Sequence, residues 1–226
     1  MKTVLLFAFA LVGFVSGSAR AADASEEALL DRWLNAQTNL VSWSAEFTQI
    51  RRFPTLTQPL ETPGRVSFKA PSSFRWQLGE PARTIAVRGP GEALIYYPKL
   101  KRAERYALGA EARGPWKDAM ALLDAGFPRS RAQLVERFEV EEIAASKGTC
   151  RLRLRPRGLR ARRLLPKMSL EFDVRTLGLT ASEFEFADGS SMRNEYRNLK
   201  ADPAMADEVF RLELPAEVTV KEPGTR

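Results

Sequence analysis

Few side chains in this sequence could perform covalent or acid–base chemistry. The chain has no histidine and a single cysteine, Cys150. The absence of histidine excludes Ser-His-Asp and Cys-His catalytic arrangements and histidine-bearing zinc sites. A lone cysteine excludes an internal disulfide and a multi-cysteine metal site. Because Cys150 lies in an alternating segment and has no histidine base, we predict a small packed side chain and not a nucleophile.

Two pairs of carboxylates are the remaining candidates for acid–base work. Glu139 and Glu141 share one face of a predicted strand, and Glu183 and Glu185 share a face of another. No catalytic signature accompanies either pair, so we interpret both as solvated sheet faces. We therefore predict no catalytic residue, no metal, no cofactor and no enzymatic activity.

An arginine run is the strongest concentration of charge. Its alternation places Arg151, Arg153 and Arg155 on one strand face, opposite Leu152 and Leu154. The run continues with Arg157, Arg160, Arg162 and Arg163. One interpretation is a solvated basic face. The other is a docking surface for an acidic partner or for anionic lipid headgroups. The candidate docking residues are Arg151, Arg153, Arg155, Arg160, Arg162 and Arg163.

Large apolar side chains recur on the predicted strands. Phe74 and Trp76 are two residues apart and share a face, and Phe68 belongs to the preceding strand. Such faces build either a packed core or an apolar cavity that holds lipid chains. The candidate lipid-binding residues are Trp43, Phe47, Phe68, Phe74, Trp76, Leu94, Tyr96, Trp116, Met120 and Leu123.

The first residues predict export from the cytoplasm. Lys2, the apolar run Val4 to Val15 and the small-residue site Ala19-Arg20-Ala21 together form the pattern of a secretory signal peptide. We expect a leader over 1–21 and one domain over 22–226. Loss of Lys2 and Arg20 with the leader lowers the formal net charge from +7 to +5. A basic secreted protein suits anionic lipids or acidic partners, whereas export argues against nucleic acid.

Helix and strand patterns predict a mainly β fold with an α+β character. Apolar spacing predicts a helix over about 26–39, with Ser25 as its N-cap, and a second helix near 114–128. About ten or eleven short strands are expected, including a C-terminal one over 209–214, while prolines predict a loop near 54–63. We predict an incomplete antiparallel β-barrel whose concave face is covered by helices acting as a lid.

The order of several short motifs resembles the LolA family of periplasmic lipoprotein carriers. The motifs are WSAEFTQIRR from Trp43, GRVSFKAPSSFRWQ from Gly64 and TIAVRGPGEALIYYP from Thr84. The resemblance covers Ser42 to Pro98 and continues as architecture beyond it. It implies an unclosed barrel with a helical lid. It also implies that Phe74 acts in cargo handover. The resemblance also implies an arginine that latches the lid, just before the proline of this motif. This sequence has Ala70 at that position, before Pro71. Lys69 and Arg75 are possible replacements, but they lie on a different strand face from position 70.

The resemblance also implies partners and a compartment. These are acylated lipoprotein or other lipid cargo, an inner-membrane ATP-driven exporter and an outer-membrane acceptor, in the periplasm of a Gram-negative bacterium. We expect a monomer. Three functions stay open: lipoprotein carriage, carriage of another lipid such as a glycolipid or a polyketide-type pigment lipid, and a non-enzymatic lipid-sensing or binding module.

Overall fold

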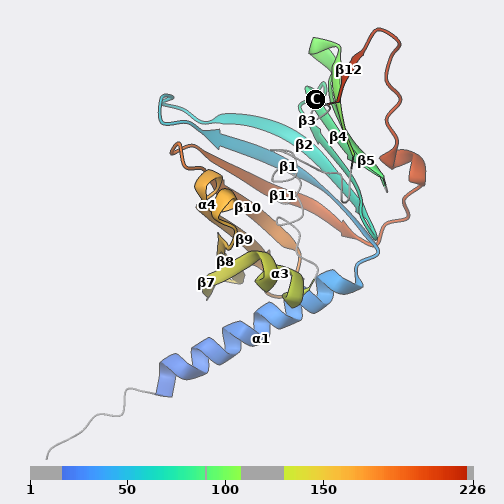
Figure 1. Ribbon diagram of the computed structural model, residues 1–226. Coiled ribbons are helices and arrows are strands. Elements are labelled where there is room, and N and C mark those ends of the chain that lie inside the picture. The colour runs from blue at the N-terminus through green and yellow to red at the C-terminus, as the bar shows by residue number, and fades with distance from the viewer. Residues whose placement is uncertain (1–16, 90, 108–129, 223–226) are drawn as a thin grey trace, which may run out of the picture.

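The computed structural model describes residues 17–89, 91–107 and 130–222 (Figure 1). The helices are α1 (Gly17–Asn39), η1 (Pro98–Leu100), α3 (Arg131–Arg137), α4 (Leu159–Leu164) and η2 (Asp207–Phe210). The strands are β1 (Ser42–Arg52), β2 (Leu60–Lys69), β3 (Ser73–Leu78), β4 (Thr84–Arg88), β5 (Glu92–Tyr97), β6 (Arg102–Ala107), β7 (Phe138–Ser146), β8 (Thr149–Pro156), β9 (Lys167–Asp173), β10 (Leu179–Glu185), β11 (Ser191–Ala201) and β12 (Thr219–Lys221).

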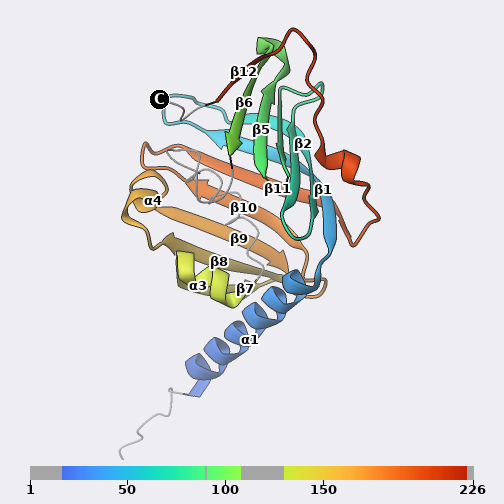
Figure 2. The same ribbon diagram turned by 45° about the vertical axis from the view of Figure 1, so that its right-hand side comes forward.

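All twelve of these strands belong to one open, strongly curved sheet (Figures 1 and 2). Their order is β12-β6-β5-β4-β3-β2-β1-β11-β10-β9-β8-β7. Each neighbouring pair is antiparallel except β12 and β6, which are parallel. The predicted mainly β, incompletely closed architecture is confirmed, with twelve strands where about ten or eleven were expected.

Helix α1 covers one half of the sheet. Its apolar residues Leu30, Trp33 and Leu34 are almost fully buried against side chains of β8 and β9. The Trp33 ring stacks on Phe172, with 4.9 Å between ring centroids and 8° between planes. We call the side of the sheet that packs against α1 the inner face, and the other side the outer face. The N-terminal part of α1 extends away from the sheet (Figure 1).

Three predicted boundaries were wrong. Helix α1 begins at Gly17, so Ser25 is an interior residue and not the N-cap; the alanine-rich stretch before it extends the helix. Pro63 lies inside β2, one residue beyond the last β2–β3 pair, Gly64 with Leu78, where its carbonyl accepts a hydrogen bond from the Gly79 N–H at 2.7 Å and its lack of an N–H breaks no pair of that ladder. The segment 209–214 is not a strand, because the chain there forms the end of η2 and an irregular stretch.

Two short helices precede β7 and β9. Helix α3 begins after Ser130, whose hydroxyl accepts a hydrogen bond from the Gln133 N–H at 3.2 Å. Helix α4 was not predicted, because its sequence was interpreted only as a run of charge. The helix predicted near 114–128 lies outside the described residues.

Candidate lipid-binding face

Five of the predicted lipid-binding aromatics meet on the inner face. Strand pairing sets Phe68 opposite both Trp43 and Phe74, and the side chains of Phe47 and Trp76 belong to the same cluster. Ring centroids lie 3.9 Å apart for Phe47 and Trp76, and 6.1 Å apart for Phe74 and Trp76. Phe47, Trp43 and Phe74 are buried, whereas Phe68 and Trp76 stay partly exposed. The face therefore combines a packed floor with two aromatic side chains that are partly exposed.

Gly64 makes room for this cluster. It pairs with Phe47 across β1 and β2. A Cβ atom built on Gly64 would lie 2.1 Å from Phe47 Cζ and 2.6 Å from the Gln77 carbonyl oxygen. Real Cβ atoms do not approach other atoms so closely, so the ring of Phe47 occupies the space that any other residue at 64 would fill.

Leu94 and Tyr96 were predicted to line the same face, and the register places them on the other one. Trp76 pairs with Ala86, and Ala86 pairs with Ile95. Directly paired residues share a face and sequence neighbours alternate, so Ile95 points inward while Leu94 and Tyr96 point outward. Leu94 is nonetheless buried, with 7% of its surface exposed. The sequence could not separate these faces, because β5 reads Glu-Ala-Leu-Ile-Tyr-Tyr with no polar alternation.

Three further candidates, Trp116, Met120 and Leu123, lie outside the described residues.

A buried polar chain separates the two apolar halves of the inner face. Gln49 Nε2 donates to Asn194 Oδ1 at 3.1 Å, and Asn194 Nδ2 donates to Ser182 Oγ at 3.2 Å. The hydroxyls of Ser182 and Tyr196 are 3.0 Å apart. Burial raises the pKa of the Tyr196 hydroxyl well above its usual range, so it stays protonated. Sequence reasoning missed this chain, since its members come from strands far apart in the sequence; only Gln49 was noted, as part of a motif.

The inner face becomes polar again beyond the aromatic cluster, on β5 and β6. Arg102 and Glu104 form an ion pair at 3.2 Å, and the Tyr106 hydroxyl donates to Glu104 at 2.7 Å. The Arg102 guanidinium lies 5.0 Å from the centre of the Tyr97 ring. Burial, together with the carboxylate of Glu104, raises the pKa of both Tyr97 and Tyr106. Polar groups therefore border the aromatic cluster on both sides.

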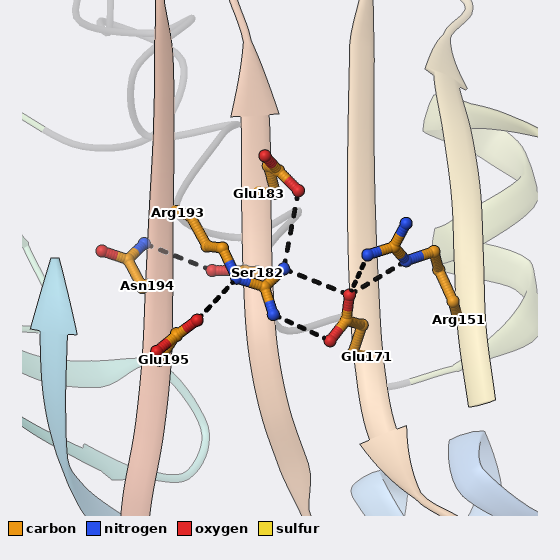
Figure 3. Close-up of polar contacts among 7 residues, drawn as sticks. All are labelled: Arg151, Glu171, Ser182, Glu183, Arg193, Asn194 and Glu195. Carbon is orange, nitrogen blue, oxygen red and sulfur yellow. Dashed lines mark hydrogen bonds and ion pairs between the residues drawn. The ribbon is translucent and has the colours of Figure 1, made fainter. Parts of the chain in front are cut away.

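The predicted arginine docking surface divides into two parts. Arg151, Arg153 and Arg155 lie on the outer face, as predicted, and each pairs with a carboxylate on a neighbouring strand: Glu171 at 2.5 Å, Glu142 at 2.9 Å and Glu139 at 2.6 Å, respectively. Arg160, Arg162 and Arg163 lie instead on α4. Figure 3 shows that Glu171 also contacts Arg193 from β11, at 2.9 Å, so that Arg151, Glu171, Arg193 and Glu183 form one network across four strands.

Both carboxylate pairs contact basic side chains on the outer face, but only Glu183 joins the network around Arg193. Glu139 and Glu141 both contact Arg155, at 2.6 and 3.0 Å, and Glu183 lies 3.5 Å from Arg193. Among the described residues, no group of three or more histidine, cysteine, aspartate or glutamate side chains is arranged to hold a metal ion. None of the helices within the described ranges is long and apolar enough to cross a membrane.

Lys69 and Arg75, the possible substitutes for a lid-latching arginine, hold a different segment. Both project from the outer face. Lys69 Nζ donates to the Met205 carbonyl at 3.0 Å and to Asp207 at 2.6 Å. Arg75 donates to the Val209 carbonyl at 3.2 Å. These contacts fasten the C-terminal segment around η2 to the back of β2 and β3.

Comparisons with known proteins agree with this architecture. The family profile described as "Outer membrane lipoprotein carrier protein LolA" matches residues 38–213. Curated outer-membrane lipoprotein carrier proteins of Xanthomonas axonopodis pv. citri and Xanthomonas campestris pv. campestris are each 26% identical over 155 residues. The match spans 66% of this chain and 66% of each relative, which is just under two thirds of their length.

One solved structure supports the fold. An uncharacterized conserved protein from Thermus thermophilus superposes with a TM-score of 0.51 at 12% identity, covering 88% of this chain and 99% of that protein. The family matched by the profile is a non-enzymatic carrier family, in agreement with the prediction that the chain is not an enzyme. Because the profile spans most of the chain, including every strand from β1 to β11, this protein belongs to the LolA family of outer membrane lipoprotein carrier proteins.

Proposed function

We propose that the protein is a periplasmic carrier that holds the acyl chains of lipoproteins against the aromatic part of its inner face. In this proposal it receives its cargo from an inner-membrane ATP-driven exporter and delivers it to an outer-membrane acceptor. The leader predicted over 1–21 would place the chain in that compartment. Membership of the family supports the proposal, as does the absence of histidine, which leaves no usual acid–base machinery.

The observation that supports carriage best is the partial exposure of Phe68 and Trp76 over a buried aromatic floor. Transfer of one CH₂ group from water to an apolar surface yields about 0.8 kcal/mol, so a long acyl chain gains roughly 10 kcal/mol or more. Apolar contact of this kind requires no ionised group in the cluster. The polar residues on both sides of it would limit how far the chain can spread.

Neighbouring residues on β3 provide a matched test. Trp76 points to the inner face and Gln77 to the outer face, since they are adjacent on one strand. A photoreactive benzoylphenylalanine placed at position 76 is expected to cross-link to an acylated lipoprotein in cells, and the same group at position 77 is not. Trp76→Ala should weaken binding of a fluorescent fatty acid by about tenfold or more, while Gln77→Ala leaves it unchanged.

Failure of both measurements would end the proposal. If the wild-type protein neither binds the fluorescent fatty acid nor cross-links from position 76, acyl chains are not its cargo. Equal cross-linking from positions 76 and 77 would also contradict it, because the inner face would then have no special role.

Carriage of a different lipid is the second candidate. The observation that favours it is Ala70, which stands where the family has a lid-latching arginine, together with the engagement of Lys69 and Arg75 elsewhere. A deletion strain separates the two candidates. Lipoproteins retained in the inner membrane support lipoprotein carriage, whereas normal lipoproteins with one missing outer-membrane lipid or pigment support the second.

A further inference from the structure

Three connections at one end of the sheet form a continuous edge. They join β1 to β2, β8 to β9 and β10 to β11, and both views place them together (Figures 1 and 2). The Ala187 N–H donates to the Leu164 carbonyl at 3.1 Å, which joins the β10–β11 turn to α4. A Cβ on Gly189 would lie 3.2 Å from Pro54 Cγ, so the same turn touches the β1–β2 connection. We call residues 51–60, 157–166 and 186–190 the docking rim.

Helix α4 presents an unusual surface within this rim. Leu159 and Arg163 are four positions apart, as are Arg160 and Leu164, so the four residues lie on one side of the helix. Leu159 is 72% exposed and Leu164 is 51% exposed, although leucine is normally buried. Both arginines are exposed. Within the described residues, the side chains of Arg160 and Arg163 form no hydrogen bond and no ion pair.

The exposure of this surface is built into the fold. Leu165 is fully buried and anchors the end of α4 in the core. Arg162, on the opposite side of the helix, donates to the Pro156 carbonyl at 3.0 Å. Arg157 donates to the Val135 carbonyl at 2.7 Å. Two arginines thus hold α4 in place, while Arg160 and Arg163 point away with the two leucines.

The β1–β2 part of the rim has the same composition. Leu56 and Leu60 are 47% and 53% exposed, and Arg51 and Arg52 are exposed beside them. Three acidic residues lie nearby: Asp188 accepts hydrogen bonds from the Ser190 N–H and hydroxyl, Glu185 lies 3.8 Å from Lys167, and Glu61, next to Leu60, is exposed. Basic charge and exposed leucines therefore coincide on two of the three connections, 51–60 and 157–166.

We propose that the docking rim rests on the surface of a bilayer that contains anionic lipids. Arginines attract the headgroups, and leucines on two separate connections enter the interfacial layer beneath them. The contrast with Arg151, Arg153 and Arg155 supports this choice, since carboxylates already neutralise those three. An edge that projects leucines from two loops suits a soft planar surface better than a shaped protein groove.

This proposal does not depend on acyl-chain binding. The rim is formed by loops at one end of the sheet, whereas the aromatic cluster lies on the inner face of β1, β2 and β3. Trp76→Ala should therefore weaken fatty-acid binding without changing attachment to vesicles, so the two proposals can fail separately.

Vesicle flotation tests the proposal on the protein in its exported form. Wild-type protein is expected to float with vesicles of phosphatidylglycerol and phosphatidylethanolamine, and to stay behind with vesicles of phosphatidylcholine alone. The double variant Arg160→Ser/Arg163→Ser should weaken binding to the anionic vesicles by about tenfold or more, and Leu159→Ser/Leu164→Ser should weaken it as well. The matched control is Arg175→Ser/Lys200→Ser, which removes equal charge from exposed residues at the far ends of the strands.

Two outcomes would overturn the proposal. Wild-type protein that fails to float with anionic vesicles has no membrane-docking rim, even if α4 variants impair cargo transfer; that combination would indicate a protein partner instead. An equal loss in the α4 variant and in the charge-matched control would indicate attraction by net charge alone.

A labelled cysteine gives a second readout that does not depend on affinity. The thiol of Cys150 is fully buried, and burial raises its pKa to about 11, so it does not compete for the label. An environment-sensitive dye on Leu159→Cys should shift to the blue and brighten when anionic vesicles are added. The same dye on Arg175→Cys should not respond; a response of equal size at both positions would contradict the proposal.

Discussion

The two halves of the inner face are both lined by apolar side chains, but they differ in how far those side chains are buried. On β8, β9 and β10, apolar side chains pack against α1 and leave no large aromatic exposed, with Trp33 stacked flat on Phe172. On β1, β2 and β3, the aromatics pack against one another, and Phe68 and Trp76 stay partly exposed. Helix α1 covers the first half. In the second half, the side chains of Phe68 and Trp76 are only partly covered by the described residues. The first half therefore forms a closed core, and the second half is where we propose that acyl chains bind.

The largest expected effect is a loss of stability when a buried ring is removed from the half that α1 covers. Trp33→Ala should lower the free energy of unfolding by about 3–5 kcal/mol, because it removes a fully buried ring and leaves a cavity between α1 and β9. Urea unfolding followed by circular dichroism measures this. Trp33→Phe is the matched control, since it keeps an aromatic ring on Phe172 and removes an indole N–H that has no partner among the described residues. Equal losses for the two variants would show that the stack is unimportant.

A smaller loss of stability is expected when a methyl group is added beside the aromatic cluster of the second half. Gly64→Ala should cost about 1–3 kcal/mol, since its methyl group would collide with the ring of Phe47. The displaced ring should also weaken fatty-acid binding, which Trp33→Phe should not do. Gly91→Ala is the control, because a Cβ there meets no atom within 4 Å. If Gly64→Ala is as stable as Gly91→Ala, the packing around Phe47 is less tight than these distances indicate.

The buried polar chain between the two halves can be interrupted at Asn194. Asn194→Ala leaves Gln49 and Ser182 without their shared partner in a buried site, which should cost about 1–3 kcal/mol in urea unfolding. Thr48→Ala removes a hydrogen bond to Arg197 on the outer face of the same strand pair and should change stability by less than about 0.5 kcal/mol. Matching losses in the two variants would mean that burial of the polar chain has no special cost.

The smallest effect is expected on the outer face, and it depends on pH. Hydrogen bonds from Arg193, and then from Arg151, hold the pKa of Glu171 below its ordinary value of 4.5, although burial opposes the shift. A lowered folded-state pKa stabilises the protein above the unfolded pKa, and this stabilisation is lost as pH falls through the folded value. Glu171→Gln should therefore cost about 1–2 kcal/mol at pH 7, and the difference from wild type should shrink below about pH 4.5.

Urea unfolding at a series of pH values tests this. Glu195→Gln serves as control, because Glu195 contacts the same Arg193 but is 51% exposed and should contribute less. A difference between wild type and Glu171→Gln that stays constant down to about pH 3 would disprove the assignment.

Patterns within a single strand were predicted well, because alternation is a local property of an extended chain. Spacing alone predicts that Trp43 and Phe47 share a face, and that Arg151, Arg153 and Arg155 share another, as the strand register shows. The helical spacing of Leu30, Trp33 and Leu34 likewise identified the side of α1 that is buried.

Relations between strands were predicted less well. Leu94 and Tyr96 have an unbroken apolar context, so only the register with β4 shows that they point outward. The pairing of Glu171 with Arg193 joins β9 and β11, which are separated by β10, and no spacing in the sequence indicates it. The tail around 209–214 was mistaken for a strand, because the Arg75 contact that holds it comes from far along the chain.

The sequence by itself determined the kind of protein this is. It established a β-rich chain without histidine, with a leader pattern at its start, aromatic strands and motifs in the order of the LolA family, since each of these depends on residue type and local spacing. The tertiary structure decided which aromatics meet, which arginines are neutralised and which remain exposed on α4 beside two leucines. Those outcomes depend on strand register and on contacts between distant segments, and neither is encoded by any short stretch of the chain.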